Sequence, residues 1–167
     1  MAGTPSPEDT ITALVTVLTA DLPAKLDGLD AEYTDALALD DISKFWLNYQ
    51  EADRYDETPA LVIVSTRSEI TFRTYRIYDH VITIHIIMIG NDVVGSYSPQ
   101  ETLTLRLYRT ARAIVETLET KPKLTISGSD YCDRIVVESI DYSDTFTDGE
   151  EFRRDGLITC LARTSTP

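Results

Sequence analysis

The stretch HVITIHIIMIGND, residues 80–92, decides the fold, because both faces of the strand that it predicts are apolar. With the two-residue period of a strand, one face is wholly apolar and carries Ile82, Ile84, Ile86 and Met88. The second face is nearly as apolar and carries Val81, Thr83, His85, Ile87 and Ile89. A half-solvated strand has a polar second face, so we expect this strand to be covered on both sides.

Both histidines of the chain lie in this stretch, and their spacing argues against a metal site. His80 and His85 are five residues apart, so they point to opposite faces of a strand and cannot bind one ion together. We interpret His85 as a packing residue rather than a base. The acid pairs in DDISKF and DYSD lack the ligand order of a calcium loop, and no nucleotide-binding or hydrolase motif occurs. We therefore expect no catalytic residue, no metal and no cofactor.

Strands flank the opening stretch on both sides along the chain. The runs at 59–66 and 68–74 predict two strands, with a turn or bulge near 75–79 before the long strand. Two further strands are expected at 133–144 and 153–164.

Two amphipathic segments predict helices. The first begins at Pro7 behind a capping Ser6 and is expected to end or kink near Asp21, ahead of Pro23. The second is one long helix at about 98–121. The sequence thus predicts a single α+β domain over 1–167, with a mixed or antiparallel sheet of about five strands and both helices packed on it.

The composition narrows the classes of function. The chain of 167 residues has a net charge of −13 and a pI near 4.4, which argues against a protein that grips nucleic acid through its phosphates. Cys132 and Cys160 are expected to be small buried residues, although one disulfide between them stays open. Neither a signal peptide nor an apolar run long enough for a bilayer is visible, so synthesis in the cytoplasm is expected.

Residues 34–58 form an irregular acidic insertion with several large apolar side chains. DDISKFWLNYQ predicts a helical turn or two and carries Phe45, Trp46, Leu47 and Tyr49. These side chains dock either on the parent domain or on a neighbouring subunit, and the sequence leaves both alternatives open.

The order of these parts resembles a known family. A striped N-terminal helix and an acidic segment lead to TPALVIVSTRSEI, YDHVITIHIIMIGND and ETLTLRLYRTARAIVETLE, and then to DRIVVESIDYSD and GLITCLART. Over residues 8–164 this is similar to the tail-terminator and tail-completion proteins of long-tailed bacteriophages, which join the tail to the head. The resemblance rests on element order, length and the character of the strand–strand–helix block.

The resemblance implies a structural protein of the virion rather than an enzyme. Members form a ring, typically a hexamer, that caps the tail tube and offers a docking surface to the head–tail connector or stopper. The implied partners are therefore copies of the chain itself, the tail tube protein and the connector, at the head–tail junction, with no membrane. DNA would pass through the lumen without specific binding.

Two groups of residues acquire expected roles from such a ring. Subunit or partner contacts are expected at Phe45, Trp46, Leu47, Tyr49, Val81, Thr83, His85, Ile87 and Ile89. Carboxylates facing the lumen would repel the phosphates of DNA, and the candidates are Asp40, Asp41, Asp53, Asp56, Glu57, Asp144, Asp148, Glu150 and Glu151.

Other interpretations stay open at this point. A head-completion or stopper protein, or another neck protein, would belong to the same machine. A tail-tube subunit is disfavoured by the single long helix at 98–121. A small enzyme or ligand-binding domain with a cleft beside His85 is the interpretation from a different class.

Overall fold

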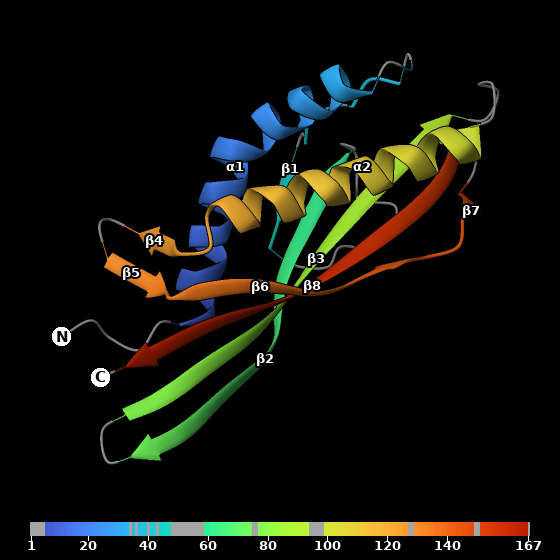
Figure 1. The fold of residues 1–167 in the computed structure, drawn as a ribbon. Coiled ribbons are helices and arrows are strands. Elements are labelled where there is room, and N and C mark those ends of the chain that lie inside the picture. The colour runs from blue at the N-terminus through green and yellow to red at the C-terminus, as the bar shows by residue number, and fades with distance from the viewer. Residues whose placement is uncertain are drawn as a thin grey trace.

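The structure is a computed structural model, and it shows two helices packed over one face of a long, twisted sheet (Figure 1). The residues that it describes are 6–33, 35, 37–39, 41–42, 44–47, 59–74, 77–93, 99–126, 129–148 and 151–166. This architecture confirms the predicted α+β class with a mixed sheet.

The main sheet has the strand order β1-β2-β3-β8-β6, and the short β7 also pairs with β8. Its strands are β1 (Lys44–Trp46), β2 (Ala60–Thr74), β3 (Ile77–Val93), β6 (Arg134–Tyr142), β7 (Phe146–Asp148) and β8 (Glu151–Thr166). A separate two-stranded sheet consists of β4 (Leu124–Ile126) and β5 (Ser129–Cys132). Every pair in the main sheet is antiparallel except β1 with β2.

The strand β2 corrects the prediction of two strands at 59–66 and 68–74. The chain continues through Thr66 as one strand, and a register shift between Ser65 and Arg67 marks an irregularity rather than a turn. A β-bulge inserts one residue without ending the ladder, so an interrupted alternation in the sequence looks like two short strands. The long strand at 80–90 is confirmed as part of β3.

The strand β1 corrects the prediction of a helical turn around residue 45. Lys44, Phe45 and Trp46 pair in parallel with Ala60, Leu61 and Val62 of β2. A segment of three residues is too short to show an apolar periodicity. This strand is therefore defined only by its pairing with β2. It is the element that makes the sheet mixed.

The helix α1 (Pro7–Glu32) also corrects a prediction, because Pro23 lies inside it. Ser6 caps its start. The Asp9 amide donates to Ser6 Oγ, and the Ser6 amide donates to the Asp9 carboxylate, which together form a capping box. A proline inside a helix costs roughly 3 kcal/mol. Leucines buried along the whole helix offset this cost: Leu14, Leu18, Leu22, Leu26 and Leu29.

The helix α2 (Pro99–Thr120) confirms the long helix expected at 98–121. Its apolar stripe of Leu107, Ala111, Ile114 and Leu118 joins the core. The same core contains Ile82, Ile84, Ile86 and Met88, so the wholly apolar face of the opening stretch lies under the helices. Cys132 and Cys160 are both buried and unpaired with each other, as expected for small core residues.

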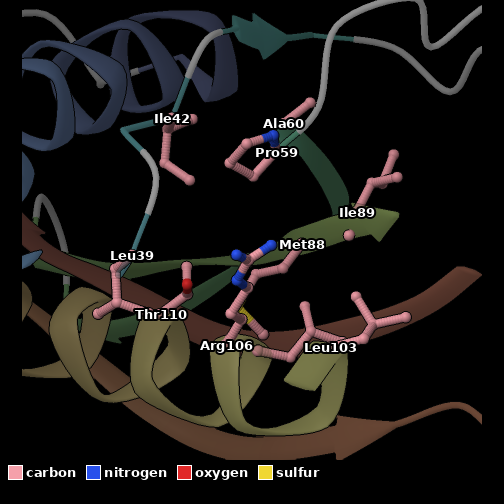
Figure 2. A pocket seen from close by; sticks show the side chains of 11 residues that line it. Leu39, Ile42, Pro59, Ala60, Met88, Ile89, Leu103, Arg106 and Thr110 are labelled. Atoms are coloured by element: carbon pink, nitrogen blue, oxygen red, sulfur yellow. The ribbon is translucent and has the colours of Figure 1, made fainter. Parts of the chain in front are cut away.

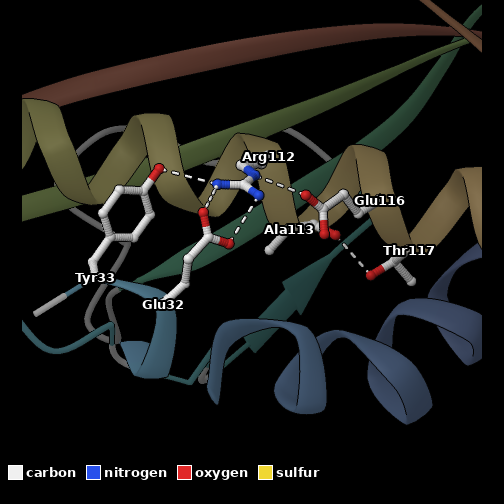
Figure 3. Close-up of polar contacts among 6 residues, drawn as sticks. All are labelled: Glu32, Tyr33, Arg112, Ala113, Glu116 and Thr117. Carbon is white, nitrogen blue, oxygen red and sulfur yellow. Dashed lines mark hydrogen bonds and ion pairs between the residues drawn. The ribbon is translucent and has the colours of Figure 1, made fainter. Parts of the chain in front are cut away.

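Arginines of α2 fasten the end of α1 and the residues after it. Arg112 donates to both carboxylate oxygens of Glu32, to the Tyr33 hydroxyl and to Glu116 (Figure 3). Arg109, which is 6 % exposed, forms an ion pair with Asp35 and lies 3.9 Å from the Tyr33 ring. These hydrogen bonds lower the pKa values of Glu32 and Asp35 and raise the pKa of Arg112. The start of the acidic insertion is therefore anchored on α2.

The contact between α2 and β3 depends on Gly90, which has no side chain. A Cβ atom at this position would lie 2.9 Å from Leu103 Cδ1 and 3.4 Å from Leu107 Cδ2. A valine there forces the helix leucines to move, and we expect Gly90→Val to lower the free energy of unfolding by about 1–3 kcal/mol in urea titrations. Gly28→Ala is the control: nothing lies within 4 Å of its added Cβ, so it should stabilise α1 slightly. An unchanged unfolding midpoint for Gly90→Val would contradict the close packing.

Candidate interaction surface

The face of the sheet opposite the helices, here called the outer face, is mostly apolar and half-buried along its middle, and it carries the exposed Glu69 and Arg163 nearer the hairpin end. Its register pairs Thr83 with Leu161, His85 with Thr159, and Ile87 with Leu157. The half-exposed side chains along it are Val81, Thr83, His85, Ile87, Val136, Leu157, Thr159 and Leu161. Both helices lie on the other face, so neither of them covers this surface (Figure 1).

One end of the outer face is closed by a second, smaller apolar cluster. Val62, Val64 and Ile89 are buried there, and Trp46 and Ile87 pack against them. The Lys44 ammonium lies 4.4 Å from the centre of the Trp46 ring. Of the expected interface residues, Ile89 and Trp46 thus pack mainly within the protein's own sheet.

The other predicted interface residues divide between core and surface. Phe45 points to the helix side and packs against the main core. Leu47 is 54 % exposed, and Tyr49 lies outside the described residues. The insertion therefore docks partly on its own domain, as one of the two alternatives had it.

The end of the β2–β3 hairpin projects beyond both helices (Figure 1). The 15 residues of β2 extend about 50 Å at roughly 3.3 Å per residue, whereas the 22 residues of α2 extend about 33 Å. Ile70 and Phe72 occupy the projecting part and are 51 % and 77 % exposed. We call these two side chains the hairpin patch.

A second exposed apolar group, the β6 patch, lies at the opposite edge of the sheet. It consists of the exposed Leu105 and Tyr108 on α2 and Ile140 on β6, together with the half-buried Tyr142. The rings of Tyr108 and Tyr142 meet edge to face at 4.7 Å, and burial raises the pKa of Tyr142. Arg154 holds this arrangement from β8 by donating to Thr104 Oγ1 at 2.6 Å and to the Ser143 carbonyl at 2.9 Å.

The sequence pattern missed the hairpin and β6 patches. For these residues the sequence predicts only a strand at 68–74 and a helix at about 98–121, with no exposed patch on either. Comparing the expected lengths of the strands and helices would have indicated the hairpin patch. Strands that are longer than the helices covering them leave their ends uncovered.

The two histidines lie on opposite faces, as their spacing predicted. His80 is on the helix side and only 4 % exposed, and its Nε2 lies 2.6 Å from Ser68 Oγ. Its Nδ1 is buried without a hydrogen-bond partner among the described residues, and burial lowers the pKa of His80. His85 is half-buried on the outer face, between Val64 and Thr159.

The buried His80 predicts a loss of stability in acid. Because its pKa is lowered in the folded state, the unfolded chain binds the proton first as pH falls below about 6.5. The free energy of unfolding should therefore drop between pH 7.5 and 5.5, and His80→Gln should make this drop smaller. Urea titrations of both proteins at the two pH values measure the difference. Identical pH dependence in the two proteins would contradict the burial of a neutral imidazole.

A small cavity lies between α2 and the β1–β2–β3 end of the sheet (Figure 2). Its lining includes Leu39, Ile42, Pro59, Leu103 and Arg106, and the Arg106 side chain rises from α2 into this space. A volume of about 60 Å³ admits a few water molecules and is far smaller than the pockets that hold metabolites.

Few of the acidic residues expected in a lumen fall within the described residues. Asp41 and Asp144 are exposed, and they flank opposite edges of the sheet, next to β1 and after β6. Asp148 and Glu151 have described backbones that pair with each other where β7 meets β8. Asp40, Asp53, Asp56, Glu57 and Glu150 lie outside the described residues.

The described residues contain no group of three or more His, Cys, Asp or Glu side chains arranged to hold a metal ion. Within the same residues, neither helix has the length and apolarity that a membrane span requires. Comparison of the chain with protein-family models and with curated proteins finds no match.

Proposed function

We propose that this chain is a structural protein of a long-tailed bacteriophage that forms a ring, most simply a hexamer. The ring caps the tail tube, ends its growth and docks on the head–tail connector. The proposal is supported by the resemblance in element order and by the surface chemistry of the fold. It assigns the chain no reaction, no cofactor and no membrane contact.

The observation that carries the proposal is the pair of exposed apolar patches at opposite edges of one sheet. The hairpin patch lies on β2, and the β6 patch lies two strands beyond β3. A contact between two different patches is heterologous, so it repeats from copy to copy and closes into a ring when the rotation allows. The outer face then remains for a companion protein of the virion, such as the tail tube or the connector.

The acidity of the chain fits a ring through which DNA slides. With a net charge of −13, the surface repels phosphates instead of binding them. Asp41 and Asp144 are the described candidates for the lumen, and both are exposed. Under this proposal, neutralising the lumen carboxylates retards the passage of DNA.

Two measurements test the proposal. Native mass spectrometry of the purified chain should show a closed oligomer with a single subunit number. Electron microscopy of tails assembled without this chain should show overlong or ragged tubes that carry no heads. A monomer at high concentration together with normal tails would reject the proposal, and normal tails with leaking or empty heads would point to a stopper instead.

A further inference from the structure

One edge of the sheet, along most of β2, has no described strand beside it. The strand β1 pairs only with Ala60, Leu61 and Val62, so it leaves the stretch Ile63–Thr74 without a strand on that side within the described part of the chain. Edge strands of this length carry a row of backbone N–H and C=O groups that can pair with another chain.

The other edge of the sheet is open along β6. At the start of this strand, the Ile135 amide donates to the Pro122 carbonyl at 2.8 Å. From Val136 to Tyr142, no further strand lies on the outer side of β6 among the described residues. The two open edges belong to the same sheet and differ in sequence, which is what a heterologous contact between copies requires.

The strand directions of the two edges match for an antiparallel pairing. The pairs β2–β3, β3–β8 and β8–β6 are each antiparallel, so β2 and β6 run in opposite directions within one subunit. A neighbour that continues the sheet keeps these directions. Its β2 therefore meets β6 in the antiparallel sense, which gives well-aligned hydrogen bonds.

The apolar side chains select one register for this pairing. Ile70 and Phe72 point to the helix side, because they pair with His80 and Tyr78 of β3. Ile140 pairs with the buried Ile158, so it points to the helix side as well, and Tyr142 follows two residues later. When Phe72 is placed opposite Ile140, Ile70 falls opposite Tyr142, and both patches are covered at once. The β2 segment lies between the two bulges of its strand, and the β6 segment lies after the bulge between Val137 and Ser139.

Charge and shape agree with this register. Residues 66–79 hold three arginines and two acids, a net charge of +1, whereas residues 133–144 hold one arginine and four acids, a net charge of −3. On the outer side, Arg73 falls opposite Ser139, with Asp141 at the diagonal position. The end of the hairpin is directed along β6 toward Val137 and Val136, which line a groove of about 200 Å³ with Leu118 and Pro122.

We infer that the subunits of the ring are joined by a continuous sheet, in which the edge of β2 beyond β1 in one copy pairs with β6 of the next copy. Phe72 then lies opposite Ile140. This inference rests on the proposed ring and names the contact that builds it.

Cysteine cross-linking between two tagged chains tests the pairing. One chain carries Phe72→Cys and the other Ile140→Cys, and both are co-expressed and oxidised. Directly opposed residues in an antiparallel pair are near enough for a disulfide, so a linked heterodimer is expected. The native thiols do not interfere, because Cys132 and Cys160 are buried, and burial raises the pKa of Cys160 to about 12.

The control replaces Ile140→Cys by Ser139→Cys, which is one residue away and exposed on the other face of β6. We expect at least about tenfold less heterodimer from this combination, since neighbouring side chains point to opposite faces. A ring in native mass spectra with equal linking in both combinations would overturn the pairing and leave the ring intact. Linking of Phe72→Cys only to itself would also overturn it, by showing an isologous contact. A chain that stays monomeric, and whose absence leaves tails normal, would remove the proposed function together with the pairing.

Discussion

Replacing Ile70 and Phe72 together by aspartate should dissociate the proposed ring while the subunit stays folded. Both side chains are more than half exposed within one chain, so their loss removes little of the core. In an assembled ring they would be buried, and two carboxylates there would lie without partners beside the acidic β6. Interface anchors of this kind contribute 2 kcal/mol or more each, so the double variant should weaken assembly by at least about a thousandfold.

Sedimentation velocity over a range of concentrations measures this effect, and thermal unfolding checks the fold. Thr12→Asp with Thr19→Asp is a matched control, because it adds the same charge at two exposed positions of α1. The control should assemble like the unmodified chain. If the hairpin variant assembled equally well, the hairpin patch would have no part in the contact.

Replacing Ile86 by alanine should destabilise the subunit by about 2–5 kcal/mol. Ile86 is fully buried and lies in register with Ile63 of β2 and Ile158 of β8, which are also fully buried. The cavity would therefore open at the middle of the three longest strands, under both helices, where the surroundings can collapse only partly.

The cost should appear as a fall of about 5–15 °C in the melting temperature, given the size of the chain. Leu47→Ala is the control, because Leu47 is 54 % exposed and its truncation should cost under about 1 kcal/mol. Both proteins are compared at one concentration, since assembly adds to apparent stability. Equal melting temperatures for the two variants would show that Ile86 does not lie in the core.

Periodicity in the sequence predicted the elements that have a strong pattern of their own. The stripe of Leu107, Ala111 and Ile114 predicted α2, and the alternating apolar residues from Ile82 to Met88 predicted the buried face of β3. In both cases the residues that form the local apolar pattern are also the residues that pack in the core. A single sequence is therefore sufficient to predict these elements.

Tertiary contacts decided the elements that the sequence did not predict. Pro23 disfavours a continuing helix locally, but burial of Leu22, Leu26 and Leu29 outweighs it. Lys44–Trp46 becomes a strand only because the start of β2 offers an edge beside it. No pattern inside a short segment reveals such a distant partner.

The candidate surface was predicted in part. The alternation correctly placed Val81, Thr83, His85 and Ile87 on a face away from the helices. Phe45 and Trp46 proved to pack within the protein, because pairing of β1 turns them to opposite sides of the sheet. Side-chain direction in the insertion depended on this pairing, which the sequence did not show.

The long ladder that joins β2, β3 and β8 has a mechanical consequence. Hydrogen bonds between antiparallel strands lie perpendicular to the strands, so a pull along the hairpin loads the whole row in shear. A pull across the sheet would instead open the pairs one after another. The projecting hairpin should therefore resist a pull along its strands. A force at its tip is transmitted to the strands beneath the helices.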